Sequence, residues 1–199
     1  MPNWTYNKLS ITGSKKERDR FVAEIVKEKF SFQNIKPRPK ELDITSGSAV
    51  DNGRDILKTE QGDWSGIDQK LNWPAWIKGV IKEGMTLDEK RIALLTSMKD
   101  NISYTDMAEA KQSIENEAKY GCKDWYDWNY RYWGTKWDAC EPQTKVNKTS
   151  IYIEFDTAWN APFPIIDELC QKFPKLKFVL RFRDEFEEIF STYENEEVY

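Results

Sequence analysis

The chain has 199 residues, of which 39% are hydrophobic and 32% charged, and its formal net charge is −4. This length fits one domain with an insertion or two small domains, while the mild negative charge excludes a DNA mimic and gives no support to general nucleic-acid binding. Three cysteines without tight spacing exclude a disulfide framework, and we expect a reducing cytoplasm because the chain has neither a long apolar run nor a signal sequence.

The charges are unevenly distributed along the chain. Residues 1–40 carry ten Lys/Arg against four Asp/Glu, whereas residues 184–199 carry seven Asp/Glu and no basic residue. Runs of this kind are usually solvated faces and frayed tails. The alternative interpretation is a docking tail or a charged surface for a partner.

The N-terminal segment predicts a strand followed by a helix. Residues 4–12 alternate, with Leu9 and Ile11 on one side. Ser14 and Glu17 then match a capping box, which favours a helix start at this point. The other side of the predicted strand carries Trp4, Tyr6 and Lys8.

The middle of the chain predicts irregular and helical structure. Residues 43–71 are polar and lack a clear period, so we expect a loop with at most short helices. Three segments then carry helical caps and apolar stripes, at residues 72–81, 86–100 and 105–120.

The C-terminal third returns to strands and one helix. Residues 151–156 and 176–183 alternate apolar with polar side chains, and the segment from Pro162 to Phe173 predicts the helix between them. The weakest element is a strand near residues 133–140. With the middle segment set aside, the order is that of an α+β, ferredoxin-like β-α-β-β-α-β sandwich.

This order predicts two parts. Residues 1–42 plus 132–199 form the ferredoxin-like domain, and residues 43–131 form a large helical insertion between the first helix and the second strand.

An aromatic segment stands out at residues 125–137, where seven of thirteen residues are aromatic. These rings follow no single period, so the favoured interpretation is core packing that joins the insertion to the sheet. The alternative is a platform for stacking bases or binding a peptide, formed by Trp125, Trp128 and Trp133.

Four stretches carry a family resemblance: MPNWTYNKLSITG, FQNIKPRPKEL, WYDWNYRYWGTKWDA and FDTAWNAPFPIIDELCQKFP. Together they resemble the YubB, or Api-type, family of phage and plasmid proteins with a ferredoxin-like domain. The resemblance implies that fold and an origin on a mobile element, with the host cytoplasm as compartment. It brings no established activity and no catalytic residues.

The chain offers little reaction chemistry. It contains no histidine, no phosphate-binding glycine loop and no nucleophile elbow. Carboxylate pairs such as Glu154 with Asp156, or Asp124 with Asp127, are expected by chance among 34 acidic residues. We therefore predict no enzyme activity, no metal and no cofactor.

The sharper candidate is the face of the sheet opposite its helices. Aromatic side chains on the central strands of such sheets stack bases in RNA-recognition modules. Against this, Glu154 and Asp156 share the face, and the insertion could cover it, which we favour. We expect this face to carry Trp4, Tyr6 and Lys8 of the first strand together with Tyr152, Lys177 and Arg181.

The leading hypothesis is a non-enzymatic phage or plasmid accessory protein that binds a host protein or protein–nucleic acid complex. A host-defence component such as a CRISPR nuclease is the expected target, since many aromatics suit an interface and no catalytic constellation is present. The alternative is binding of RNA or single-stranded nucleic acid through the sheet face. No membrane partner is expected.

Overall fold

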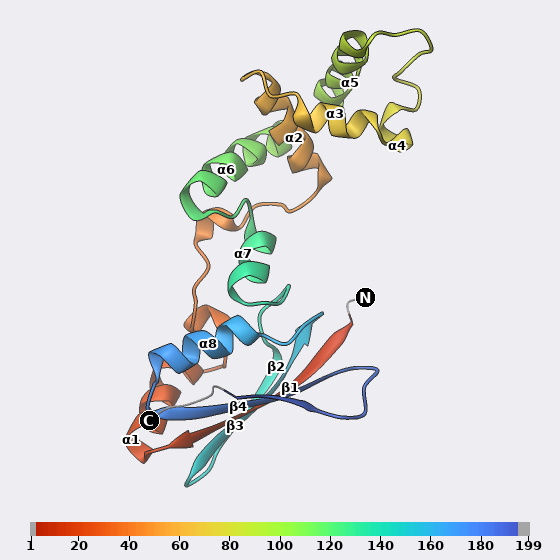
Figure 1. Cartoon of the computed structure of the whole chain (residues 1–199). Coiled ribbons are helices and arrows are strands. Elements are labelled where there is room, and N and C mark those ends of the chain that lie inside the picture. The colour runs from red at the N-terminus through yellow and green to blue at the C-terminus, as the bar shows by residue number, and fades with distance from the viewer. Residues whose placement is uncertain (1–2, 195–199) are drawn as a thin grey trace. The chain divides into compact units, whose positions relative to one another are not determined.

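The computed structural model describes residues 3–194 of the chain. The chain divides into two compact units (Figure 1). Unit 1 combines the N-terminal residues up to Pro39 with the residues from Tyr126 onward, and unit 2 comprises Lys40–Trp125.

Unit 1 contains helices and strands in mixed order. Its elements are β1 (Trp4–Gly13), α1 (Lys15–Phe21) with a π-helical continuation (Val22–Val26), a 3-10 turn (Phe32–Asn34), β2 (Cys140–Val146), β3 (Ser150–Ala158), α8 (Phe163–Lys172), β4 (Leu176–Asp184) and β5 (Ser191–Glu194). Helix α7 (Trp125–Tyr132) leads into the C-terminal part of this unit.

The strands form one antiparallel, five-stranded sheet in the order β2-β3-β1-β4-β5. The N-terminal strand β1 is therefore central, and its Leu9 lies opposite Ile153 of β3 and Leu180 of β4. Helices α1 and α8 pack on one face of this sheet (Figure 1). Alternate residues of each strand consequently point either to these helices or to the opposite face.

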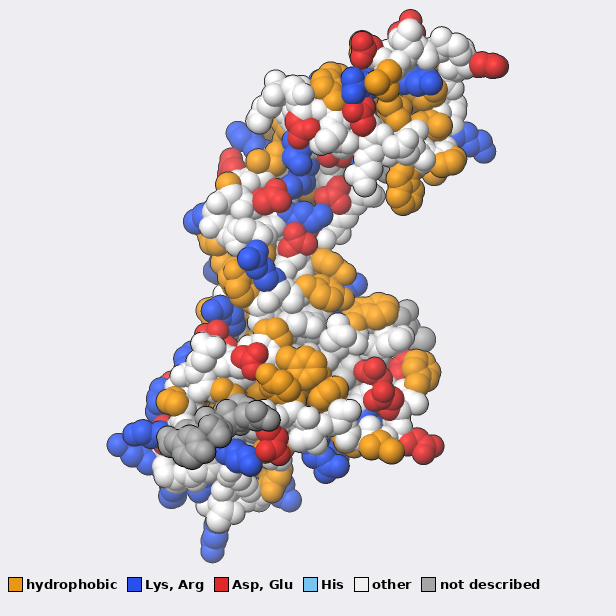
Figure 2. All heavy atoms as spheres, viewed as in Figure 1, with side chains coloured by type: hydrophobic (Ala, Val, Ile, Leu, Met, Phe, Trp, Pro, Cys, Tyr) orange, Lys and Arg blue, Asp and Glu red, His pale blue; other side chains and the backbone are white. Residues whose placement is uncertain are grey.

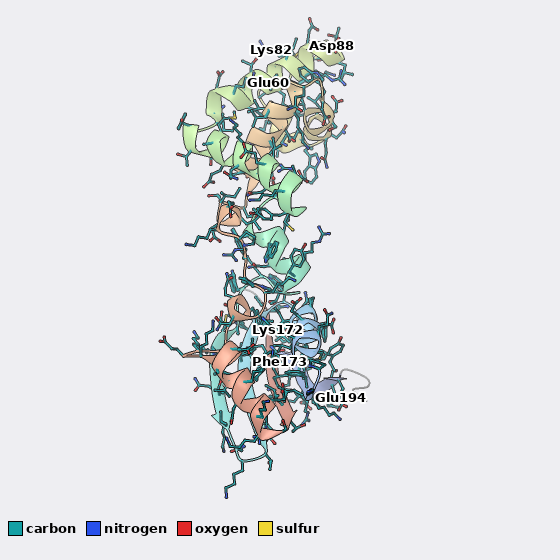
Figure 3. The ribbon with its side chains drawn as sticks, turned by 90° about the vertical axis from the view of Figure 1, so that its left-hand side faces the viewer. Glu60, Lys82, Asp88, Lys172, Phe173 and Glu194 are labelled. Carbon is teal, nitrogen blue, oxygen red and sulfur yellow. The ribbon has the colours of Figure 1, made fainter. Side chains whose placement is uncertain are left out.

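The core of unit 1 lies between the sheet and its helices and is rich in rings. Phe173, which is labelled in Figure 3, lies at the end of α8. Phe21 of α1 packs edge-on against it, with ring centroids 5.4 Å apart. Leu9, Ile153 and Leu180 face the same layer and are at most 1% exposed. Burial of this apolar face is what holds the two distant ends of the chain in one sheet.

The first turn of α1 is anchored by polar contacts. The Ser14 hydroxyl accepts a hydrogen bond from the Glu17 amide at 3.3 Å, as the capping pattern predicts. The buried Arg18 guanidinium donates to three carbonyl oxygens, those of Gly13, Asn147 and Lys148. The start of α1 is thus joined to the turn between β2 and β3.

Unit 2 is helical. A small apolar core forms from Ile56, Ile67, Leu94 and Met98. Gly53 faces Ala110, and a Cβ atom at Gly53 would come within 2.6 Å of the alanine methyl group. The helices are α2 (Ser48–Thr59), α3 (Ser65–Leu71), α4 (Pro74–Ile77), α5 (Leu87–Asn101) and α6 (Tyr104–Tyr120).

Two helical expectations for this unit have opposite outcomes. Helix α5 begins at the capping box of Thr86 with Glu89, as expected. The prediction of a loop with at most short helices over residues 43–71 is wrong, because α2 has 12 residues. Its pattern is hidden because the buried side includes Arg54, which donates to the Ser113 hydroxyl at 2.7 Å and forms an ion pair with Glu117.

The strand expected near residues 133–140 lies further along the chain, at Cys140–Val146. It is an edge strand whose side chains are mostly exposed, so little apolar alternation marks it. The aromatic segment before it is in part a helix, α7. In the described residues we find no helix that is long and apolar enough to cross a membrane.

Candidate functional site

The face of the sheet opposite α1 and α8, which we call the outer face, is the candidate site. Side chains alternate between the two faces of a strand, so every second residue of β1, β3 and β4 points to the core and the residues between them point to the outer face. The outer face comprises Trp4, Tyr6 and Lys8 of β1, Tyr152, Glu154 and Asp156 of β3, and Lys177, Arg181 and Arg183 of β4.

The strand register decides which of these residues meet. Lys8 lies between Glu154 and Arg181, and its ammonium is 3.0 Å from the Glu154 carboxylate. Tyr6 lies opposite Asp156, whereas Tyr152 lies opposite Ser10. The two tyrosines are therefore separated by four residue steps, roughly 13 Å along the sheet. They are not neighbours that could sandwich a single base.

Lys177 lies opposite Thr12, close to the end of β1. Its ammonium is 3.3 Å from the Glu194 carboxylate of β5. Lys8 and Lys177 are thus each paired with a carboxylate, and these exposed pairs contribute little to stability. This surface therefore carries both cations and carboxylates.

A cluster of cations and rings lies beside these pairs. The Arg183 guanidinium is 5.0 Å from the centroid of the Tyr6 ring and 5.2 Å from that of Phe190. Arg181 and Lys8 approach the same Phe190 ring at 5.4 and 5.6 Å. Attraction of cations to the ring face holds such a cluster together. Phe190 belongs to the segment between β4 and β5, which we had interpreted as part of an acidic tail.

The other end of the outer face is hollowed. A shallow depression of about 500 Å³ lies along β2 and β3 and includes the ring of Tyr152, which is 44% exposed. Its lining mixes amide, hydroxyl, ammonium and carboxylate groups, from Gln143, Thr144, Lys145, Asn147, Tyr152 and Glu154. This mixture suits polar contacts of both signs.

The aromatic segment contains four tryptophans, and the three predicted to form a platform do not join the outer face. Trp133 is 1% exposed, and its indole N–H donates to the Lys36 carbonyl at 2.9 Å. Trp128 is 8% exposed and stacks on Tyr132 with centroids 4.1 Å apart. Trp125, at the start of α7, is half-buried.

Trp4 links the outer face to the aromatic segment. Its ring centroid is 6.0 Å from that of Trp137, whose ring also lies 5.1 Å from the Lys136 ammonium. Trp4 is half-buried, so it forms the edge of the outer face rather than its centre.

Two acidic groups at the outer face, Asp156 and Cys140, have pKa values shifted toward the neutral form. Burial, followed by the charge of Glu141, raises the pKa of Asp156. Burial and the nearby Asp156 and Asp138 carboxylates raise the pKa of the Cys140 thiol, which lowers its thiolate fraction. Residues 3–194 contain no group of three or more Asp, Glu or Cys side chains placed to hold a metal ion.

Comparison with known proteins bears on the C-terminal part of the sheet. Residues 132–195 match the family model of the ferredoxin-like domain in Api92-like protein. The chain is therefore similar to that domain over the region of β2, β3, α8, β4 and β5. The origin on a phage or plasmid stays a prediction.

Among solved structures, the chain is similar to the crystal structure of the protein api92 from Yersinia pseudotuberculosis. The two are 11% identical, with a TM-score of 0.45, and the likeness covers 96% of this chain and 93% of that chain. None of the curated proteins compared matches the chain.

Proposed function

We propose that this chain is a non-enzymatic binding protein that recognises another protein through the outer face. The observation that carries the proposal is that the face combines exposed rings with cations paired to carboxylates on the same face. Tyr152 is 44% exposed, the Lys8–Glu154 pair includes its neighbour on β3, and the Lys177–Glu194 pair lies on β4 and β5, across β1 from it. Protein interfaces use such mixtures of aromatic anchors and polar groups of both signs.

The charge balance favours a protein over a nucleic acid as the partner. Phosphate recognition relies on cations that are free to replace counterions along the backbone. On the outer face Lys8 and Lys177 already lie within ion-pair distance of carboxylates, and the whole chain has a net charge of −4.

We further propose a phage- or plasmid-encoded accessory role in the host cytoplasm, with a host-defence component such as a CRISPR nuclease as target. The support is the resemblance of four sequence stretches to the YubB family, including WGTKWDA in the aromatic segment. Catalysis, metal and cofactor form no part of the proposal.

The same proposal includes the complete topology. Strand order β4-β1-β3-β2 and helices on one face are what a β-α-β-β-α-β ferredoxin-like sandwich requires, with β5 added at the β4 edge. Residues 1–42 plus 132–199 then form that domain, and residues 43–131 are a helical insertion between α1 and β2. The compact units, which change at Pro39 and Tyr126, support this division.

Affinity capture during infection tests the proposal. The tagged wild-type chain and Tyr152→Ala would be compared with Tyr104→Ala, a matched control whose tyrosine is 91% exposed in unit 2. We expect one defence complex with wild type and control, and at least a tenfold lower yield with Tyr152→Ala, the loss typical of an interface anchor. Equal recovery by all three chains, or recovery of nucleic acid alone, would contradict the proposal.

A second candidate, binding of RNA or single-stranded nucleic acid, is favoured by the cluster of Arg183 with Tyr6 and Phe190. Rings and guanidinium groups together stack bases and contact phosphates. This candidate predicts a salt-dependent affinity for an unstructured oligonucleotide that is lost in both Tyr6→Ala and Tyr152→Ala. Fluorescence anisotropy that detects no binding at low salt would eliminate it.

A further inference from the structure

The segment between β4 and β5 presents two large apolar side chains to solvent. Phe186 is 81% exposed and Ile189 is 82% exposed, and among the large hydrophobic side chains that the structure describes only Tyr104 exceeds them. Exposed carboxylates of Glu187 and Glu188 lie between the two. Figure 2 shows hydrophobic and acidic side chains gathered over this segment. We call residues 185–190 the β4–β5 loop.

The base of the β4–β5 loop is fixed to the sheet. The Thr5 hydroxyl donates to the Asp184 carboxylate at 2.9 Å, and the Glu185 amide donates to the Trp4 carbonyl at 3.0 Å. The Glu187 amide closes a turn by donating to the Asp184 carbonyl at 3.0 Å. Three hydrogen bonds thus define where the chain leaves β4.

Arg183 fixes the far side of the loop. Its guanidinium lies near both the Tyr6 and Phe190 rings, and one of its nitrogens donates to the Glu187 carbonyl at 2.6 Å. Phe190 is thereby held against the outer face while Phe186 and Ile189 point to solvent. The contacts of Thr5, Trp4 and Arg183 fix the backbone of the loop and leave the side chains of Phe186 and Ile189 exposed.

A fixed loop of this kind is prepared for binding, because ordering it on association requires little conformational entropy. Apolar side chains scattered singly over a surface are ordinary, but two in one anchored loop form a compact anchor. Glu187 and Glu188, which lie between these two side chains, favour a partner of opposite charge. They also disfavour an anionic membrane surface, which attracts basic rather than acidic segments.

We propose that the β4–β5 loop inserts Phe186 and Ile189 into an apolar site rimmed by Lys and Arg on the partner protein. The inference rests on the proposed function and names the chemistry of the partner. Phe186 and Ile189 of the loop and Tyr152 of the outer face are different contact points, so substitutions at each test the two proposals separately.

A displayed library of random 16-residue peptides provides the probe. Clones are selected on the 199-residue chain, and those that also bind the Phe186→Ser/Ile189→Ser variant are removed, which leaves loop-dependent sequences. We expect these to combine apolar residues with Lys and Arg. A synthetic consensus peptide should bind the Phe186→Ser/Ile189→Ser variant at least tenfold more weakly than it binds wild type. The Glu187→Lys/Glu188→Lys variant should show a loss of the same size. Tyr104→Ser serves as the matched control and should bind like wild type.

Circular dichroism of each variant checks that the exposed substitutions leave the fold intact. Loop-dependent peptides that are acidic, or the lack of any loop-dependent peptide, would overturn the inference. Self-association that sedimentation detects in wild type and not in the double variant would also overturn it, in favour of a second copy as occupant. If the unmodified chain yields no loop-dependent peptide while Tyr152-dependent capture is intact, the loop inference fails and the proposed function stands.

Discussion

Replacement of Trp133 probes the junction between the aromatic segment and the sheet. The indole is 1% exposed, lies edge-on to Phe32 with centroids 5.8 Å apart, and donates to the Lys36 carbonyl at 2.9 Å. Trp133→Phe keeps most of the ring but leaves that carbonyl without its donor, at a cost of about 1–3 kcal/mol. Trp133→Ala also opens a cavity and should cost about 3–5 kcal/mol.

Hydrogen exchange of the β3 amides of Ile151 and Ile153 measures this effect in unit 1 independently of unit 2. Since about 1.4 kcal/mol corresponds to a factor of ten, exchange through global opening should accelerate roughly 5- to 150-fold in Trp133→Phe. The acceleration in Trp133→Ala should be larger, at least roughly 150-fold. Trp73→Phe, at a residue 59% exposed in unit 2, is the control and should leave these rates unchanged.

Identical exchange rates in Trp133→Phe and wild type would refute the role assigned to the indole hydrogen bond. Equal effects of the two substitutions would refute the role assigned to ring packing.

Four further predictions concern unit 1. Gly134→Ala should destabilise the fold by at least about 1 kcal/mol in urea titrations, because φ at Gly134 is +77° and a Cβ atom would lie 2.6 Å from Pro164. Burial raises the pKa of Cys170 to about 11, so at pH 8 its alkylation by iodoacetamide should be about a hundredfold slower than that of a thiol of ordinary pKa 9; comparable rates would contradict this. The raised pKa of Asp156 means that its charge opposes folding, so Asp156→Asn should stabilise the protein at pH 7 and lose this advantage below the ordinary pKa of 3.8. Arg183→Ala should accelerate amide exchange within the β4–β5 loop at least tenfold while β3 exchange stays unchanged, and Arg183→Lys should restore only part of the protection.

The sequence was informative where one face of an element is buried and the other is solvated. Alternation around Leu9, Ile153 and Leu180 predicted three strands that are now seen side by side. The Thr86 capping box predicted the start of α5 for the same local reason. Alternation and capping patterns each involve residues a few positions apart, so they can be read without knowledge of the tertiary structure.

Elements without an uninterrupted apolar face were not predictable. Helix α2 buries Arg54 against groups of α6, so its apolar stripe is interrupted. Strand β5 is an edge strand whose side chains are mostly exposed, so it gives no periodic signal. Alternation also cannot state which residues lie opposite each other in neighbouring strands.

The candidate site shows the same division. Lys8 and Arg181 were expected on one face, and the register brings them opposite each other. That register also separates Tyr6 from Tyr152, which composition could not reveal. Phe190 was missed because it follows an acidic run. The available signal was its apolar ring placed shortly after the basic Arg181 and Arg183.

The central position of β1 has a consequence for biosynthesis. This strand is synthesised before the other strands of its sheet. Its neighbour β4 begins at Leu176, roughly 160 residues after β1 ends at Gly13. At ordinary translation rates that interval is roughly 10–30 s. Unit 2 is continuous in sequence and is synthesised within this interval, so its helices can form before the sheet closes. During that time both edges of β1 lack their partner strands, and a chaperone can shield them.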